Sequence, residues 1–382
     1  MAKRKPIVIL DIPNETDLRR LYQLAVQYRE LQPWDWMDDR DIFSVVDPVS
    51  DVRYYISVLG SAGIDYSLAA FRGAAGHDFL SNLRDKNKNL SDFNEKVRLE
   101  ALYLTLEDRS FLDKHDLDTL RRFGIRCEGP HNWPCFRSMG TGLLPDQLNG
   151  SECRTMIHLL EQTLLIAQRA ESDKSFLVTV YAEDDDGQLT YVPVYLTRFA
   201  TVQDGEQTWQ EEYRESEQFH PVYPRIRLSD KEQLSHVLSL PVDESFTLEI
   251  DISYIDIAIR GTNGERSYHP QLMTIISSDG FFVAFELFKS IQEKTKTFNQ
   301  QLTAIFNRLL KYIEGSQARP GQILTCREEA YLLLEPLCDQ LDIQLMQLPM
   351  LKETPRMVEE MMIGVNDWDD LEKLDEMVDL DD

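Results

Sequence analysis

Three acidic residues lie where predicted strands end, and together they could bind a divalent metal ion. Asp47 follows the apolar run Ile42–Val46, and Glu107 and Asp108 follow a second run, Val97–Leu106. If both strands end at one sheet edge, the carboxylates converge on Mg²⁺ or Mn²⁺, as metal-dependent phosphodiester cleavage requires. The structural alternative is that the acid before proline begins a turn and the acidic pair ends a strand in solvent. We favour this alternative and keep the three acids as the catalytic candidates of a nuclease hypothesis.

Cysteine and histidine residues form a second candidate site, for zinc. Cys127, His131 and Cys135 have the spacing C-x₃-H-x₃-C, and thiolate and imidazole are ligands that Zn²⁺ prefers. Zinc loops normally use closely spaced cysteine pairs on tight turns, whereas Pro130 and Pro134 stiffen this loop. A free cysteine is also more often a small buried apolar residue than a ligand. We therefore predict no cofactor, and Mg²⁺ or Mn²⁺ only under the nuclease hypothesis.

The segment after these residues combines aromatic side chains with an arginine. Trp133, Phe136 and Arg137 are candidate binding residues, because aromatic rings stack on planar groups and a guanidinium clamps a carboxylate. They can equally hold a loop against the core, which is the simpler interpretation. Gly140 and Gly142 lack the Lys-Ser/Thr pair of a phosphate-binding loop, and no G-x-S-x-G or H-E-x-x-H motif occurs. The sequence thus offers no support for nucleotide hydrolysis, esterase or zinc-protease chemistry.

Two segments carry a family resemblance. The motif P-W-D-W-M lies in the first segment, near Trp34, and the motif W-P-C-F-R-S begins the second, at Trp133. Together they resemble an uncharacterised bacterial family in which an N-terminal domain of unknown function is followed by another near the C-terminus. The resemblance covers most of the chain. It implies no catalytic or ligand-binding residue.

The acidic C-terminal segment has the pattern of a recognition element. Trp368, Leu371, Leu374 and Val378 are spaced by three, three and four residues, so a helix would place them on one face. Around them, residues 359–382 contain eleven acids and one lysine. Such a segment can bind the basic-rimmed groove of a partner protein. The alternatives are a helix that packs on its own domain and a solubilising tail. Trp368, Leu371 and Leu374 complete the candidate binding residues.

Hydrophobic periodicity predicts the elements that position these residues in the N-terminal half. Apolar residues recur first at helical spacing and then in three short runs separated by turn residues, which is typical of a β-meander with flanking helices. A polar stretch, Thr201–Tyr223, is predicted as a connector. The predicted elements are helices over Leu18–Leu31, His77–Leu83, Leu112–Phe123 (capped by Gly124) and Glu152–Ala170, and strands over Ile42–Val46, Tyr54–Leu59, Tyr66–Phe71, Val97–Leu106, Phe176–Tyr181 and Leu189–Leu196.

The C-terminal half predicts a βββαβαβα unit. This element order is that of an RNase H-like fold, by analogy of pattern alone. The N-terminal order is similar enough to suggest a duplication of one unit as an alternative. The predicted elements are strands over Phe246–Ile259, Leu272–Ile276 and Phe281–Phe288, a helix over Phe298–Ile313, a strand over Gln322–Thr325, a helix over Glu328–Leu341, a strand over Ile343–Leu348 and a helix from about Pro355.

An active RNase H-like nuclease needs several carboxylates around its metal ions. The strand Leu272–Ile276 contains no acid, Asp279 lies in a predicted turn, and Arg327 follows the strand that ends near Cys326. Only the last helix, with Glu359 and Glu360, is well supplied. The set of metal-binding acids is therefore incomplete.

Composition narrows the class of protein further. The chain has 382 residues, of which 42% are hydrophobic, so it can form packed cores. Its 40 basic and 66 acidic side chains give a net charge of -26, which disfavours non-specific binding to nucleic acid or anionic membranes. An odd number of cysteines, five, and the lack of a long apolar run favour a reduced, cytoplasmic protein. The oligomeric state is not indicated.

These observations predict an α+β protein that binds other proteins. We expect an N-terminal arm (1–13), an N-terminal α+β domain (14–175), a β-hairpin and polar connector (176–240), a C-terminal α/β domain (241–358) and an acidic tail (359–382). The predicted function is that of an interaction or regulatory protein. The alternatives are a nuclease dependent on Mg²⁺ or Mn²⁺ and, because of the net charge of -26, an acidic mimic of DNA.

Overall fold

The chain divides into two compact units, each with its own sheet. Unit 1 comprises Met1–Phe219 and unit 2 His220–Asp382. Helices and strands are mixed in both, which confirms the α+β class. The computed structural model describes residues 11–85, 92–183, 189–203, 206–225, 227–228, 230–261, 265–288, 296–363 and 365.

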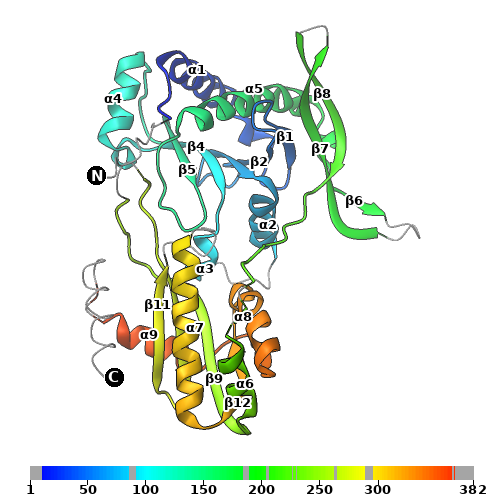
Figure 1. Ribbon diagram of the computed structural model, residues 1–382. Coiled ribbons are helices and arrows are strands. Elements are labelled where there is room, and N and C mark those ends of the chain that lie inside the picture. Colours follow the sequence, from blue (N-terminus) through cyan, green and yellow to red (C-terminus); the bar gives the residue numbers. More distant parts are fainter. Residues whose placement is uncertain are drawn as a thin grey trace, which may run out of the picture. The chain divides into compact units, whose positions relative to one another are not determined.

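A mixed sheet of eight described strands forms the centre of unit 1 (Figure 1). Strands β1 to β5 pair in antiparallel fashion with their sequence neighbours, which confirms the predicted meander. β7 joins the sheet parallel to β1 and pairs on its two edges with β6 and β8. The strands are β1 (Phe43–Val46), β2 (Arg53–Leu59), β3 (Ser67–Arg72), β4 (Ala101–Glu107), β5 (Trp133–Met139), β6 (Val180–Glu183), β7 (Leu189–Gln203) and β8 (Glu206–Glu215).

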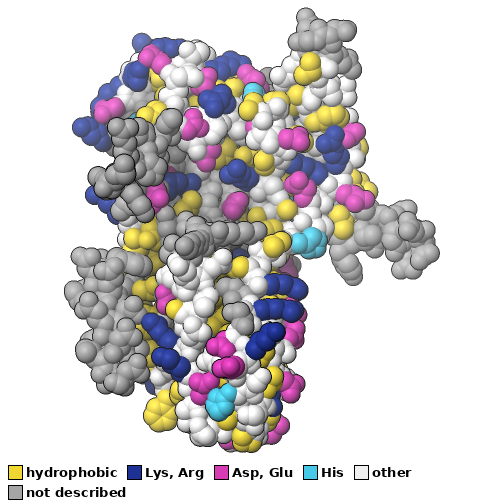
Figure 2. Space-filling view, viewed as in Figure 1, with side chains coloured by type: hydrophobic (Ala, Val, Ile, Leu, Met, Phe, Trp, Pro, Cys, Tyr) yellow, Lys and Arg dark blue, Asp and Glu magenta, His cyan; other side chains and the backbone are white. Residues whose placement is uncertain are grey.

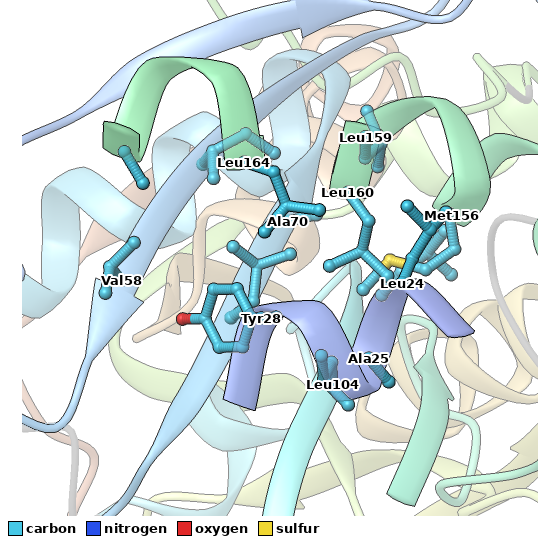
Figure 3. Close-up of a cluster of buried hydrophobic side chains, with 14 of the residues drawn as sticks. Leu24, Ala25, Tyr28, Val58, Ala70, Leu104, Met156, Leu159, Leu160 and Leu164 are labelled. Atoms are coloured by element: carbon cyan, nitrogen blue, oxygen red, sulfur yellow. The ribbon is translucent and has the colours of Figure 1, made fainter. Parts of the chain in front are cut away.

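Helices cover both faces of this sheet, and strand alternation directs apolar side chains to each. On one face, α1 and α5 lie side by side, and Figure 3 shows Tyr28 and Leu24 of α1 near Leu160 and Met156 of α5. On the other face, α2 covers a smaller cluster that contains Tyr55. The helices of unit 1 are α1 (Glu15–Leu31), α2 (Gly73–Arg84), α3 (Phe93–Lys96), α4 (Lys114–Phe123) and α5 (Gly150–Ser172), with short 3₁₀ turns η1 (Pro33–Asp35), η2 (Arg109–Phe111) and η3 (Ser175–Leu177).

Unit 2 contains a five-stranded sheet in the order β11-β10-β9-β12-β13. β9 to β11 are antiparallel, whereas β12 is parallel to β9 and β13 is parallel to β12. The predicted βββαβαβα order is present, and the RNase H-like assignment, which rests on that order, stays a prediction. The elements are α6 (Lys231–Ser239), β9 (Val242–Tyr254), β10 (Gln271–Ser277), β11 (Phe282–Phe288), α7 (Lys296–Ser316), β12 (Arg319–Thr325), α8 (Glu328–Leu341), β13 (Gln344–Gln347) and α9 (Glu353–Met361).

The two faces of the unit 2 sheet are covered by different helices. Leu248, Ile250 and Ile252 of β9 pack against α7 and α8 in the main core. The opposite face, with Leu272 and Phe285, packs against apolar residues of α9 and the segment that follows it. The side chains of β9 that alternate with its apolar residues therefore point towards the α9 side.

Four elements differ from the prediction. Residues 201–223 are not simply a connector, because β8 forms there and pairs with β7 along its whole length. This edge strand is mostly polar, and its backbone hydrogen bonds to β7 form without apolar alternation. The segment from Trp133 forms strand β5 rather than a loop, and helix α6 lies within the predicted connector region. The first strand of the predicted hairpin starts later, at Val180.

Candidate binding site beside helix α4

Asp47 lies at the opposite end of the sheet from Glu107 and Asp108. Asp47 follows β1, and antiparallel pairing from β1 to β4 brings Ala101, the first residue of β4, to that same end. β4 then runs away from Asp47 and ends at Glu107. The three predicted catalytic acids are therefore not brought together.

Asp47 is buried and held by side chains from two elements. Its Oδ1 lies 2.8 Å from Nδ1 of His158, and its Oδ2 accepts hydrogen bonds from Thr155 (3.1 Å) and from the Ser50 hydroxyl (2.6 Å). Burial alone would raise the pKa of Asp47, but the hydrogen bonds from His158 and Ser50 outweigh burial and lower it to about 2. The carboxylate is ionised and ties the end of β1 to α5.

The zinc candidates have separate partners. Cys127 Sγ lies 3.6 Å from the Arg29 guanidinium, and buried Cys135 Sγ lies 3.9 Å from an oxygen of Asp116. Burial, together with the charge of Asp116, raises the pKa of the Cys135 thiol to about 12, which opposes the thiolate that zinc binds. Within the described ranges, no three His, Cys, Asp or Glu side chains, including His131, form a group that could hold a metal ion.

Phe136 and Arg137 are engaged inside unit 1. Arg137 donates two hydrogen bonds to the buried carboxylate of Asp116 on α4, from Nη1 to Oδ1 (3.0 Å) and from Nη2 to Oδ2 (2.6 Å). This contact raises the pKa of Arg137 above its ordinary value. The buried ring of Phe136 meets Tyr22 edge to face at 5.3 Å. Both residues thus fasten β5 to its neighbours.

Trp133 differs from these neighbours, because its partly exposed ring lines a recess of unit 1. The recess has a volume of about 330 Å³ and lies between α4, the residues after it and η2. Its floor is apolar and consists of Leu117, Leu120, Ile125 and Trp133. We call this recess the α4 groove.

The end of α4 builds that floor. Gly124 has φ 67°, a left-handed conformation that glycine adopts without strain, and it ends the helix. The backbone N–H of Ile125 then donates to the carbonyl of Leu120 at 3.0 Å. This turn folds Ile125 back towards the last turn of α4, so that both residues line the groove.

Charged side chains form the rim of the α4 groove, namely the three arginines Arg109, Arg121 and Arg126 and one acid, Glu128. Arg109 lies over the Trp133 ring at 5.9 Å from its centroid, and Arg121 pairs with Asp118 at 2.8 Å. Arg109 and Arg126 form no ion pair with any residue that the structure describes. Figure 2 shows Lys and Arg side chains, mixed with acidic ones, over the α4 end of unit 1 at the upper left. In a chain with a net charge of -26, this local excess of cations points to an anionic ligand.

A second recess lies beside the same loop. It has a volume of about 280 Å³ and is lined by residues that include Arg29, Trp34, Tyr66 and His131. The Tyr66 ring lies 5.0 Å from Trp34 and 5.3 Å from His131. His131 and Gln32 of its lining have φ of 52° and 53°, which is uncommon for residues other than glycine. Arg29 and Asp35 both line it, and this mixture of charges favours no single ligand chemistry.

Two buried acids of unit 2 were not among the site residues predicted from the sequence. Asp251 on β9 accepts hydrogen bonds from Thr325 (2.9 Å) and from the Cys326 thiol (3.1 Å), and pairs with Arg327. Glu249 also lies on β9, on the same side. Leu272–Ile276, where the sequence has no acid, belongs to β10, the second strand of the unit, whereas these two acids lie on the first strand. The alternating T-L-E-I-D-I in β9 was the signal that could have found them.

Glu249 binds the beginning of α9. Its carboxylate accepts hydrogen bonds from the backbone N–H groups of Lys352 (3.1 Å), Glu353 (2.9 Å) and Thr354 (2.8 Å). The hydroxyl of Thr354 adds a fourth, at 3.0 Å. Glu249 therefore supplies from a neighbouring strand the acceptor that a helix N-terminus normally finds in its own cap.

The two α+β units match two family models. Residues 19–186 match a Domain of unknown function (DUF7309), and residues 233–362 match a Domain of unknown function (DUF6930). The chain therefore carries paired N-terminal and C-terminal domains of unknown function, as the resemblance implied. No curated protein and no solved structure matches it.

The predictions about membranes and about the two ends of the chain can be compared with the structure only for the residues that it describes. None of the described helices is long and apolar enough to cross a membrane. The binding residues predicted in the tail, Trp368, Leu371 and Leu374, lie outside the described residues, as does most of the predicted N-terminal arm.

Proposed function

We propose that the protein acts by binding a partner protein, in an interaction or regulatory role, and does not cleave nucleic acid. The observation that carries this proposal is the state of the buried acids. Asp251 is paired with Arg327, Glu249 is bound by α9, and Asp47 is bound by its three side-chain donors. A metal-dependent nuclease needs carboxylate oxygens that face the ions rather than protein donors.

A divalent-metal nuclease is the second candidate, and one observation favours it. Glu249 and Asp251 occupy alternate positions of β9, the central strand of the unit 2 sheet, and both side chains lie on the same side. For metal binding, the Arg327 guanidinium would have to leave Asp251. The acidic DNA mimic has only the net charge of -26 in its favour.

A cleavage assay tests the proposal. The full chain is incubated with labelled single-stranded and duplex DNA and RNA in Mg²⁺ or Mn²⁺, beside the variants Asp251→Asn and Asp47→Asn. We expect no cleavage that depends on either carboxylate. Cleavage that is lost in Asp251→Asn but kept in Asp339→Asn, an exposed acid of α8, would establish the nuclease instead. Circular dichroism of each variant verifies that it is folded.

A further inference from the structure

The α4 groove has the chemistry of a site for an acidic amphipathic peptide. Its floor is apolar, and Arg109 and Arg126, which have no ion-pair partner among the described residues, lie at its rim. Its volume of about 330 Å³ is near the lower end of the range for ligand sites, roughly 300–1,000 Å³. A groove of this size accepts one large aromatic anchor with the chain beside it, rather than a whole domain.

This chain itself carries a segment of matching chemistry. Residues 366–382 contain nine acids and one lysine, so their charge is opposite to that of the rim, where three arginines outnumber the single acid Glu128. Trp368, Leu371 and Leu374 are spaced so that one helical face would present all three. An aromatic anchor in an apolar pocket, surrounded by complementary charges, is the usual composition of a strong contact.

We propose that the α4 groove binds the acidic segment 366–382 of a second copy of this chain. The apolar face of the segment enters the groove, with Trp368 against the floor, and its carboxylates pair with Arg109 and Arg126. Val365, just before the segment, packs on the α9 face of the unit 2 sheet. The segment belongs to unit 2 in the chain, whereas the residues that line the groove belong to unit 1. This inference rests on the proposed binding function and names its partner.

Peptide binding tests the groove. The receptor is the full chain with its own segment disabled by Trp368→Ser, Leu371→Ser and Leu374→Ser, and the probe is a fluorescent peptide of residues 366–382. We expect saturable binding by fluorescence anisotropy, weakened by salt. Reversing the rim charges with Arg109→Glu and Arg126→Glu should weaken binding by about tenfold or more. Arg40→Glu, which reverses an exposed arginine outside the groove, should leave binding unchanged.

The anchor is tested with a matched peptide. Replacement of Trp368 by Ala in the peptide should weaken binding by about tenfold or more, because a buried aromatic anchor dominates such contacts. A peptide of the same composition in scrambled order should bind no better than that variant. Equal binding of the scrambled peptide would show that charge alone attracts the segment and would overturn the proposed site.

Sedimentation of the unmodified full chain tests whether the segment binds the groove of a second copy. We expect a concentration-dependent dimer or larger assembly that dissociates in high salt, and a monomer for the variant with the disabled segment. A monomeric full chain would overturn the second-copy assignment, even if the peptide binds. The cleavage assay does not depend on this result. A negative result in the peptide or sedimentation experiments would overturn the α4 groove as the site for segment 366–382, whereas cleavage that depends on Asp251 would overturn the proposed function.

Discussion

Asp47 illustrates how individual residues of this protein hold charge in the interior. The sequence offered it as a metal ligand at a sheet edge, whereas the structure surrounds it with His158, Thr155 and Ser50. A buried carboxylate with this many donors is stable as an anion and leaves few lone pairs for a metal ion. Its role is to join the end of β1 to α5.

Loss of the Asp47 charge should destabilise unit 1 in a pH-dependent way. The pKa of Asp47 is lowered from 3.8 to about 2 in the folded state, so its stabilising effect is present above about pH 4 and is lost as the pH falls towards 2. This shift corresponds to about 2 kcal/mol of unfolding free energy. We expect Asp47→Asn to lose about that amount at pH 7 and little at pH 2, as measured by urea unfolding.

Asp51→Asn is the control for that measurement. Asp51 lies in the same turn but is exposed, and its φ of 57° suits asparagine. We expect its unfolding free energy to stay within about 0.5 kcal/mol of that of the native chain. An equal difference between Asp47→Asn and the native chain at pH 7 and pH 2 would contradict the account of the ionised carboxylate.

At the scale of elements, α9 depends on a strand that is far from it in sequence. Lys352 precedes the helix without a side-chain cap, and Glu249 of β9 instead accepts hydrogen bonds from the first N–H groups. The negative charge also interacts favourably with the positive end of the helix dipole. The covering of one face of the unit 2 sheet therefore depends on one buried carboxylate.

Replacement of Glu249 by Gln should loosen α9 selectively. The amide keeps the shape but removes the charge and directs an NH₂ group at backbone donors, at a cost of about 1–3 kcal/mol. Hydrogen exchange monitored by mass spectrometry should show faster exchange over Glu353–Met361, whereas the exchange rate of α7 should stay unchanged. Glu244→Gln, at an exposed position of the same strand, should not change exchange in α9. Unchanged protection of α9 in Glu249→Gln would contradict this role.

At the scale of the whole molecule, the two units have separate hydrophobic cores. Leu159 of α5 is fully buried in the core of unit 1, and Leu309 of α7 is fully buried in that of unit 2. Each unit also has its own sheet. We therefore expect the units to unfold as separate cooperative transitions.

Matched truncations test this separation. Leu159→Ala and Leu309→Ala should each cost about 2–5 kcal/mol, because each leaves a cavity in a packed core. Hydrogen exchange should show that the first variant loses protection in unit 1 only and the second in unit 2 only. Loss of protection in both units from either substitution would show one cooperative transition instead.

The sequence by itself determined most elements of the fold, because strong periodicity reflects burial directly. The meander β1 to β3 and the helices α1, α5 and α7 formed close to their predicted bounds, since each buries an apolar face whose spacing is visible locally. β8 was not predictable in this way. It is a mostly polar strand that is stabilised by backbone pairing with β7 at the sheet edge.

Only the tertiary structure decided which side chains meet. Strand direction placed Glu107 at the opposite end of the sheet from Asp47, and pairing of β9 with β12 brought Asp251 to the residues that end β12. The α4 groove likewise combines η2, α4 and the start of β5. Local periodicity determines which residues are buried, whereas sites depend on register and direction between segments far apart in the chain, which no local pattern encodes.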